Sequence, residues 1–418
     1  MEVKAGYRQT DAGVIPVDWE IRAALDISTP VRGGSPRPAG DPRFFNGTFI
    51  PWLTVAALTN IPDSQLFVFE TSSCLTEAGS LRSRTLFPGT LIIANSGATL
   101  GVAKLLGIKC CANDGIAALL NLSCEISSEY LVYYINTKTS FLRKIVASGN
   151  GQPNLNTGLI GNLKFPFPPT KAEQEAIAGA LSDADALIES LEKLVAKKRQ
   201  CKHGVMKELF TGQKRLPGFT GEWETKRLGE LGAFLKGSGV SKSQAMSGHL
   251  PCVRYGEIYT RHNDYIKEFF SFISVEVAQT ATRLKHGDIL FAGSGETKPE
   301  IGKCVALVQD IEAYAGGDIV ILRTDNQDPI FLGYYLNTPA IARQKASKGQ
   351  GDAVVHISSA ALAAISGKFP KPDEQAAISA ILSDIDAEIE SIETKLAKAK
   401  QFKLGMVQEL LTGRIRLT

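Results

Sequence analysis

Two segments of this 418-residue chain place apolar residues at alternating intervals of four and three positions. The positions are Ile177, Leu181, Ala184, Ile188, Leu191 and Val195 in the first segment and Ile378, Leu382, Ile385, Ile389, Ile392 and Leu396 in the second. This spacing is the seam of a coiled coil, which is narrower than the stripe that a helix turns toward a globular core. It predicts two helices, each of about 38 residues and roughly 57 Å.

A helix of that length needs another long helix to cover its seam, and the other segment is the obvious partner. We expect the two helices to run antiparallel, because the chain must return. Such a pair would act as a rigid spacer between two domains, and its length suits DNA half-sites one helical turn, roughly 34 Å, apart. An ordinary long linker is the alternative. The outer faces, rich in Glu, Asp and Lys, are either solvated or bind helices of a partner protein.

The two helical segments are copies of one another. Residues 173–216 align with residues 374–417 without a gap, and 24 of the 44 aligned positions are identical. Outside the helices the halves match weakly but in order, with Trp19 opposite Trp223 and "YYINT" opposite "YYLNT". Such self-similarity indicates a repeated architecture. The chain therefore reads as variable domain, helix, variable domain, helix.

Short apolar runs between Gly, Pro and Asn predict strands in each variable segment, and aromatic residues at helical spacing predict one helix. The expected strands cover 48–58, 85–95 and 116–122 and then 249–258, 285–292 and 318–323; the expected helices cover 129–146 and 330–346. We expect an α+β fold in which two similar strand-rich domains are separated by an antiparallel coiled coil, with a pseudo-two-fold internal repeat. The predicted boundaries are 1–170 for the first domain, 171–215 for the first helix, 216–370 for the second domain and 371–418 for the second helix.

Composition and charge exclude several classes of protein. The chain is 44% hydrophobic and 21% charged, with a formal net charge of +3. A non-specific nucleic-acid binder is usually far more basic, so any DNA binding must come from local patches and base contacts. No apolar run is long enough to span a membrane and no signal segment is evident, so we expect a cytoplasmic protein.

The seven cysteines and five histidines form no metal or disulfide pattern. The cysteine count is odd, no Cys-x-x-Cys occurs, and the spacing of His249 and Cys252 has no second pair to complete it. We therefore expect reduced cysteines, no metal and no cofactor.

The chain resembles the specificity subunit of Type I restriction-modification systems over essentially its whole length. The motifs are "GQPNLNTGLIGNLKFPFPPTKAEQEAI" (151–177), "LTG" at the helix end (411–413), and the domain openings "IPVDWE" (15–20) and "FTGEWE" (219–224). Each motif is loose alone, but together, in duplicate and in this order they are specific.

The resemblance implies that two target-recognition domains each read one half of a bipartite site in double-stranded DNA. It also implies that the long helices set the gap between the halves and bind two methyltransferase (modification) subunits, and that motor-nuclease (restriction) subunits complete the enzyme. The chain itself would not be an enzyme. In one departure, "GQGDAVVHIS" (349–358) replaces "GNGQPNLN" (149–156), with Asp352 opposite Gln152. We therefore expect two different half-sites and an asymmetric full site.

Side chains with hydrogen-bond donors and acceptors on loops that enter the major groove are the candidates for sequence reading. Gly-rich loops allow close approach of the backbone. The candidates are Arg32, Arg37, Arg43, Thr54, Asn95, Ser96, Thr99, Lys104, Asn150, Gln152, Asn154, Arg254, Tyr255, Ser294, Thr297, Lys298, Lys303, Gln350 and His356. Ordinary turn chemistry or a surface loop is the alternative in each segment.

Enzymatic readings lack essential parts. "FAGSGE" (291–296) matches an amino-methyltransferase loop, but no Asn/Asp-Pro-Pro-aromatic motif accompanies it. Asp288, Glu296 and Lys298 mimic a nuclease set, yet the first copy has no such set, and no Walker motif occurs. A single-chain DNA adenine methyltransferase or restriction-modification enzyme remains the main alternative, and a scaffold without DNA contact is the second.

Overall fold

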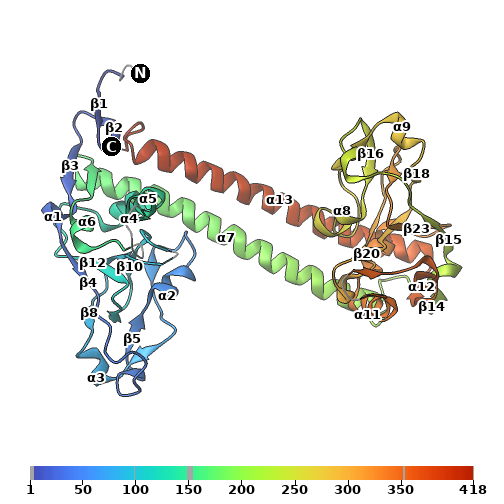
Figure 1. Ribbon diagram of the computed structural model, residues 1–418, viewed down its shortest axis with the longest axis horizontal. Helices are drawn as coiled ribbons and strands as arrows, with labels where there is room; N and C mark the ends of the chain where they lie inside the picture. Colours follow the sequence, from blue (N-terminus) through green and yellow to red (C-terminus); the bar gives the residue numbers. More distant parts are fainter. Residues whose placement is uncertain (1–3, 98, 148–153, 352–353, 418) are drawn as a thin grey trace. The chain divides into compact units, whose positions relative to one another are not determined.

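The computed structural model describes residues 4–97, 99–147, 154–351 and 354–417. The chain divides into two compact units (Figure 1): unit 1 comprises Met1–Val195 and Ser391–Thr418, and unit 2 comprises Ala196–Glu390. Each unit thus contains one strand-rich domain and one part of each long helix. The two long helices are α7 (Lys171–Phe210) and α13 (Pro372–Leu410), so their lengths agree with the predicted length.

The domain of unit 1 consists of short strands and short helices. The strands are β1 (Tyr7–Thr10), β2 (Gly13–Pro16), β3 (Glu20–Ala23), β4 (Thr29–Arg32), β5 (Phe45–Leu53), β6 (Phe67–Val68), β7 (Cys74–Leu75), β8 (Arg84–Leu86), β9 (Leu91–Ala94), β10 (Ala103–Leu106), β11 (Cys110–Ala112), β12 (Ile116–Leu120) and β13 (Lys164–Phe167). The helices are α1 (Ala24–Ile27), α2 (Val55–Thr59), α3 (Glu77–Ser80), α4 (Ser128–Thr137), α5 (Thr139–Ala147) and α6 (Thr157–Gly161).

Unit 1 has two larger sheets, and its described buried residues form three clusters. The sheets have the orders β4-β12-β9-β10-β6 and β7-β5-β11-β8. Strand β9 is buried on both faces: Leu91 and Ile93 belong to the cluster that includes helix α4, whereas Ile92 and Ala94 pack with residues of the second sheet. Alternation of side chains along a strand makes this double role possible.

The domain of unit 2 is built in the same way. Its strands are β14 (Glu224–Arg227), β15 (Gly232–Lys236), β16 (Leu250–Val253), β17 (Ser271–Ile273), β18 (Thr282–Arg283), β19 (Ile289–Ala292), β20 (Ser294–Gly295), β21 (Cys304–Ala306), β22 (Tyr314–Ala315), β23 (Ile319–Thr324), β24 (Val355–His356) and β25 (Ser366–Phe369). Its helices are α8 (Tyr255–Thr260), α9 (Val275–Ala278), α10 (Pro329–Tyr335), α11 (Pro339–Lys348) and α12 (Ser359–Ala363), with short 3-10 turns η1 (Leu228–Glu230), η2 (Lys242–Gln244) and η3 (Lys298–Glu300).

The sheet orders of unit 2 repeat those of unit 1, apart from the fifth strand, β6, at the edge of the first sheet. They are β15-β23-β19-β21 and β17-β16-β22-β18, and a two-stranded β14-β25 corresponds to β13-β3. The shared motif "YYxNT" explains one repeated contact. The Asn136 side chain bonds both backbone groups of Ala103 in β10, and Asn337 does the same with Cys304 in β21. The internal repeat is therefore structural as well as sequential.

Ion pairs show that the helix segments run antiparallel within each unit. The pairs are Asp185–Lys403 (2.5 Å) and Glu192–Lys400 (2.6 Å) in unit 1, and Lys198–Glu388 (2.6 Å) and Lys202–Asp386 (2.6 Å) in unit 2. As the residue number rises along α7, that of its partner on α13 falls.

The twelve predicted seam residues are all buried or half-buried. The buried ones are Ile177, Leu181, Ile188, Val195, Ile378, Leu382, Ile389 and Ile392, and the half-buried ones are Ala184, Leu191, Ile385 and Leu396. The seam does not serve the helix pair alone, however. Ile177 and Leu181 join the core of the first domain, and Ile378 and Leu382 join that of the second, because the first turns of each helix lie against the domain before it.

Several predicted secondary structures were wrong in part, and the strand expected over 85–95 is two strands, β8 and β9. The strand expected over 48–58 ends at Leu53, because the Thr54 hydroxyl accepts a hydrogen bond from Ala57 N (3.4 Å) and begins helix α2. The strand expected over 249–258 likewise ends at Val253, but here the bond runs the other way: the Glu257 carboxylate, inside α8, accepts from Arg254 N (3.2 Å) at the start of the helix. Each helix expected over 129–146 and 330–346 is two helices, broken near Lys138 and before Pro339.

Candidate nucleic-acid interface

The residues that the two helix copies share fasten each domain to its helix. Gln174 accepts a hydrogen bond from Ser127 N (2.9 Å), at the start of α4, and Gln375 accepts one from Asp328 N (3.0 Å), at the start of α10. Each glutamine is buried. These positions are identical in the two helix copies. The structure gives the reason, because each glutamine holds its helix to the domain that carries the candidate loops.

The neighbouring glutamate binds an arginine from the far end of the other helix. The Arg416 guanidinium donates to the Glu173 carboxylate (2.8 Å) and also to Asp18, while Arg215 donates to Glu374 (2.7 Å). These arginines lie over Trp19 and Trp223 respectively. Hydrogen bonding to these carboxylates raises the pKa of Arg416 and of Arg215.

A tyrosine, an aspartate and a lysine form a third repeated anchor. Tyr133 donates to Asp185 (2.9 Å), which also binds Lys403; in unit 2, Tyr334 donates to Asp386, which binds Lys202. Burial, reinforced by the aspartate, raises the pKa of both phenols above their usual range. The phenols therefore stay protonated and act as donors.

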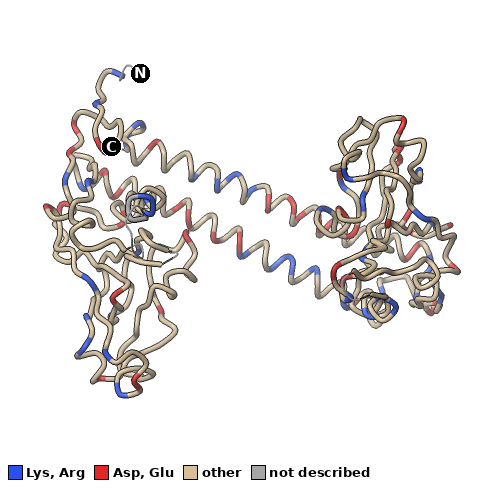
Figure 2. Tube along the Cα trace, in the orientation of Figure 1, with Lys and Arg blue, Asp and Glu red and all other residues tan. Residues whose placement is uncertain are grey.

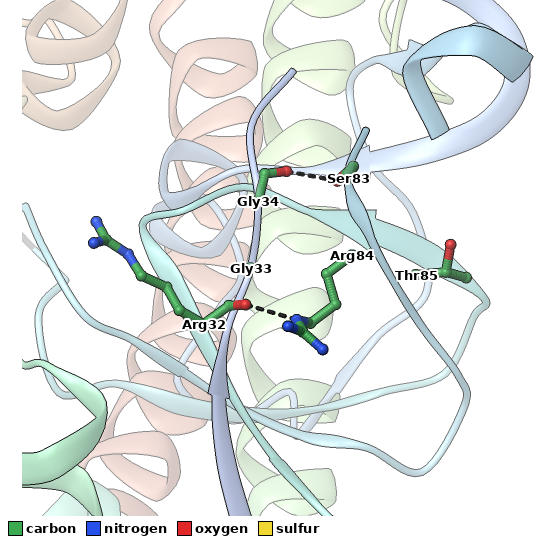
Figure 3. A pocket seen from close by; sticks show the side chains of 6 residues that line it. All are labelled: Arg32, Gly33, Gly34, Ser83, Arg84 and Thr85. Carbon is green, nitrogen blue, oxygen red and sulfur yellow. Dashed lines mark hydrogen bonds between the residues drawn. The ribbon is translucent and has the colours of Figure 1, made fainter. Parts of the chain in front are cut away.

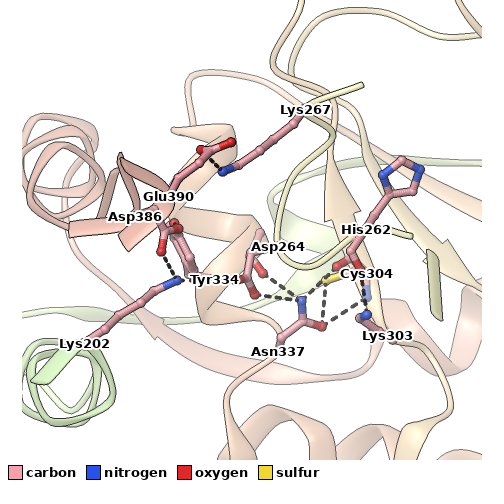
Figure 4. A network of polar contacts seen from close by, with 11 residues as sticks. Lys202, His262, Asp264, Lys267, Lys303, Cys304, Tyr334, Asn337, Asp386 and Glu390 are labelled. Carbon is pink, nitrogen blue, oxygen red and sulfur yellow. Dashed lines mark hydrogen bonds and ion pairs between the residues drawn. The ribbon is translucent and has the colours of Figure 1, made fainter. Parts of the chain in front are cut away.

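Unit 2 extends this anchor into a larger polar network (Figure 4). The Asp264 carboxylate accepts a hydrogen bond from Asn337 Nδ2 (3.4 Å) and lies 4.0 Å from the Lys202 ammonium. Lys267 forms an ion pair with Glu390 (2.8 Å). Burial raises the pKa of Asp264. Lys202, Asp264 and Lys267 each pair with another part of the domain or helix, which indicates a structural role.

Arginines of the first candidate loop gather around Asp114 in unit 1. Arg32 donates through Nε to Asp114 O (2.5 Å), Arg37 lies 3.7 Å from its carboxylate, and Asn95 Nδ2 donates to its carbonyl (3.2 Å). Three predicted site residues from two separate loops therefore meet at one turn. Asp114 itself was not predicted, since nothing in its local sequence distinguishes it.

An open groove of about 430 Å³ lies beside this turn (Figure 3). It is lined by Arg32, Gly33, Gly34, Ser83, Arg84 and Thr85. Arg84 Nε donates to Arg32 O (2.7 Å), and Ser83 Oγ donates to Gly34 O (2.6 Å). A Cβ on Gly33 would lie 2.1 Å from Asn113 O, so only glycine fits there. Arg84 was missed from the sequence, although the nearby Arg82 makes the segment locally basic.

Basic side chains continue along the same part of the first domain. Arg43 is exposed and pairs with Asp41 (2.6 Å), and Figure 2 shows Lys and Arg positions along the edge that carries β4, β8 and α3. Exposed ion pairs contribute little stability. Their guanidinium groups can exchange a carboxylate partner for a phosphate or a guanine edge.

The loop after β9 pairs with a distant segment of unit 1. Ser96 forms a β-bridge with Asn154, which is exposed. Asn95 is buried, and its Oδ1 has no hydrogen-bond partner among the described residues. The hydroxyl of the half-buried Thr99 also has none among them. Asn150 and Gln152 lie outside the described residues.

The corresponding loop of unit 2 brings three candidates into one row. Ser294 of β20 pairs with His356 of β24, with Oγ 2.9 Å from Nδ1, and Gln350 pairs with His356 through two backbone hydrogen bonds (2.9 and 2.8 Å). Ser294 is buried, whereas His356 and Gln350 are exposed.

The remaining candidates of unit 2 divide between exposed and structural positions. Thr297 and Lys298 are exposed, and the Thr297 hydroxyl donates to Glu300 (3.0 Å). Tyr255 is exposed at the start of α8, whereas Arg254 is half-buried beside Glu257 (3.4 Å). Thr54, the counterpart of Arg254, caps α2.

Two candidate lysines point into the protein. The Lys104 ammonium donates to Pro62 O (2.8 Å) and Gln65 O (2.5 Å), and Lys303 donates to His262 O (2.7 Å). Burial lowers the pKa of Lys104 to about 8 and also lowers that of Lys303. Each ammonium closes a loop by satisfying its carbonyls, so neither is placed to reach a ligand.

The nuclease-like set is not assembled as an open site. Asp288 is fully buried, and its carboxylate is bound by Arg323 (2.7 and 2.8 Å) and by Lys285 N (2.8 Å). The described part of the chain has no group of three His, Cys, Asp or Glu side chains that could hold a metal ion. Within the same ranges no helix is long and apolar enough to cross a membrane.

The fold is that of a duplicated α+β protein. Each of its two similar domains carries polar loops and packs against a long helix. A sequence profile described as the Type I restriction modification DNA specificity domain matches residues 16–197 and again 220–401. The chain therefore belongs to the Type I restriction-modification specificity family, as its motifs predicted.

Individual relatives agree with this assignment. Two specificity subunits of Methanocaldococcus jannaschii are similar to the chain. The MjaVIII subunit is 24% identical over 431 residues, covering 96% of this chain and 94% of the relative, and the MjaIX subunit is 27% identical over 320 residues, covering 70% of each.

Two solved structures share the fold. The S subunit of a Type I system from M. genitalium has a TM-score of 0.60 at 15% identity and covers 98% of both chains. A structure described for complex assembly and conformational transition of the type I R-M system has a TM-score of 0.56 at 17% identity, covering 96% of this chain and 99% of the other. The predicted fold class is thereby confirmed.

Proposed function

We propose that this chain is the DNA-recognition subunit of a Type I restriction-modification complex, with domains 1–170 and 216–370 each reading one half of an asymmetric bipartite site. One contrast carries the proposal. The two units repeat most of their sheet order and their helix anchors, yet their corresponding candidate loops differ, with Ser96 facing Asn154 in one and Ser294 facing His356 in the other. Identical supports with unlike loops suit two readers of different sequences.

Within this function, the exposed loop residues contact DNA and the long helices hold the readers. Arg37, Arg43 and Asn154 of the first domain and Thr297, Lys298, Gln350 and His356 of the second are the assigned contacts. The charged outer faces of α7 and α13 bind modification subunits, two per chain, and restriction subunits complete the complex. The presence of a complex among the structural relatives supports this assembly.

The chain supplies recognition and not catalysis. Its buried Asp288 is committed to Arg323, the methyltransferase motif is incomplete, and membership of the specificity family supports a recognition subunit over a single-chain methyltransferase. A scaffold without DNA contact would leave the difference between the two sets of loops without a use.

Methylation mapping of host DNA tests the proposal. Cells that express the chain with its modification subunits should carry one asymmetric bipartite methylation motif, which disappears when the gene is deleted. The purified chain alone should transfer no methyl group from S-adenosylmethionine. Methyl transfer by the chain alone would overturn the recognition-only role, and footprints that leave both domains unprotected would favour the scaffold.

A further inference from the structure

One position is structurally equivalent in the two domains although sequence alignment does not pair it. Ser96 faces Asn154, and Ser294 faces His356. The next backbone bonds agree, since Leu155 N donates to Asn95 O (2.8 Å) and Ile357 N donates to Gly293 O (2.9 Å). The alignment that sets Asp352 opposite Gln152 would instead pair Asn154 with Val354. An exposed amide in one domain thus corresponds to an exposed imidazole in the other.

The imidazole is held in a defined orientation. Residues directly opposite in an antiparallel ladder project to the same side of the sheet, so Ser294, His356 and Gln350 form a row across three segments. Ser294 is 4% exposed, and its hydroxyl lies 2.9 Å from His356 Nδ1. The Nδ1 atom of His356 is therefore hydrogen-bonded to Ser294. The residue as a whole is exposed to solvent, which leaves Nε2 for another partner. Which nitrogen carries the proton depends on the role of the Ser294 hydroxyl.

We infer that Asn154 and His356 occupy the same base-reading position of the two domains and help to make the two half-sites different. An amide offers a donor and an acceptor together, which matches the N6 and N7 edge of adenine, whereas an imidazole fixed through Nδ1 offers one nitrogen. The inference rests on the proposed function and adds the residue that distinguishes the halves. Ser294 is a positioning residue, because it acts through His356.

The test exchanges the two residues in the full chain, co-expressed with its modification subunits, and reads the methylation motif of the host genome. We expect His356→Asn to change one base pair of the second half-site toward adenine and to lower the preference for the original base about 5- to 150-fold. Asn154→His should relax one adenine of the first half-site. The gap and the opposite half-site should stay unchanged in both variants.

His286→Asn is the matched control. His286 is an exposed histidine that precedes β19, at the opposite end from Ser294, so its replacement should leave the motif as in the wild type. Ser294→Ala should make the same base position degenerate, whereas a merely structural serine would change the yield of complex and not the motif.

The outcomes distinguish a failure of the proposed function from a failure of this inference. If the wild type gives no bipartite motif, the proposed function fails. If the wild-type motif is present but His356→Asn leaves it intact while the complex assembles normally by gel filtration, the inference is overturned. A change at the first half-site in His356→Asn would equally contradict it.

Discussion

Lys104 shows how one side chain can have two plausible uses that sequence does not separate. A lysine two residues after a Gly-rich loop suits a phosphate contact, yet here it turns inward to the carbonyls of Pro62 and Gln65. Buried carbonyls of an irregular loop need donors, and Lys303 supplies them at the same place in unit 2. The lysine is therefore repeated because both units use it to close the same loop. Only the direction of the side chain in the structure reveals this use.

The buried ammonium of Lys104 should give the stability of unit 1 a pH dependence. The folded protein releases this proton near pH 8, whereas the unfolded chain keeps it up to about pH 10.5. Because the unfolded state binds more protons in that window, the unfolding free energy of the wild type should rise relative to Lys104→Met between pH 8 and 10.5. Denaturant titrations along a pH series measure it. The exposed Lys144→Met should show no such divergence, and parallel curves for Lys104→Met would contradict the assignment.

At the scale of elements, the long helices were the most predictable part of the chain. Their 4-3 spacing is a local property, and the structure gives helices of 40 and 39 residues with the seam buried or half-buried. The strand-to-helix change at Thr54 was missed, because a short apolar run is equally compatible with a strand or a buried helix. The meeting of Arg32, Arg37 and Asn95 at Asp114 depends on long-range strand pairing, which no local pattern encodes.

The arginine anchors allow each unit to be loosened separately. Arg416→Gln removes the partner of buried Glu173 and should cost unit 1 about 2 kcal/mol, whereas Arg215→Gln should destabilise unit 2 by removing the partner of Glu374. Hydrogen exchange of the amides at the start of α7 and of α13 measures the two effects in one experiment. Faster exchange in both units from either single change would contradict two independent anchors.

The helix pair should act as the ruler of the DNA site. Adding seven residues to the middle of α7 and of α13 keeps the seam in phase and adds roughly 10 Å to each helix. The methylated motif should then widen by about three base pairs, at roughly 3.4 Å per base pair. A four-residue addition, which shifts the seam, should reduce assembly instead. An unchanged gap after the seven-residue addition would mean that the helices do not set the distance.

At the scale of the whole molecule, we expect the repeated topology with its divergent loops to make the two domains exchangeable. Replacing residues 1–170 with the first domain of another family member should change one half-site only, because the anchors Gln174 and Glu173 belong to the retained helix. Methylation mapping again supplies the measurement, with exchange of residues 216–370 as the reciprocal control. A change in both halves would show that the two readers are not independent.

The crossed anchors also bear on how such a chain could originate. Arg416 from the end of the second repeat completes the domain of the first, and Arg215 from the end of the first completes the domain of the second. One repeat alone would therefore keep an unmatched glutamate at one end and an unmatched arginine at the other. Two identical half-length chains would satisfy both by exchanging their helix ends, as swapped dimers do. A gene for such a half would encode a homodimer with two equal readers suited to a palindrome, and its duplication and fusion would free each reader to evolve its own target.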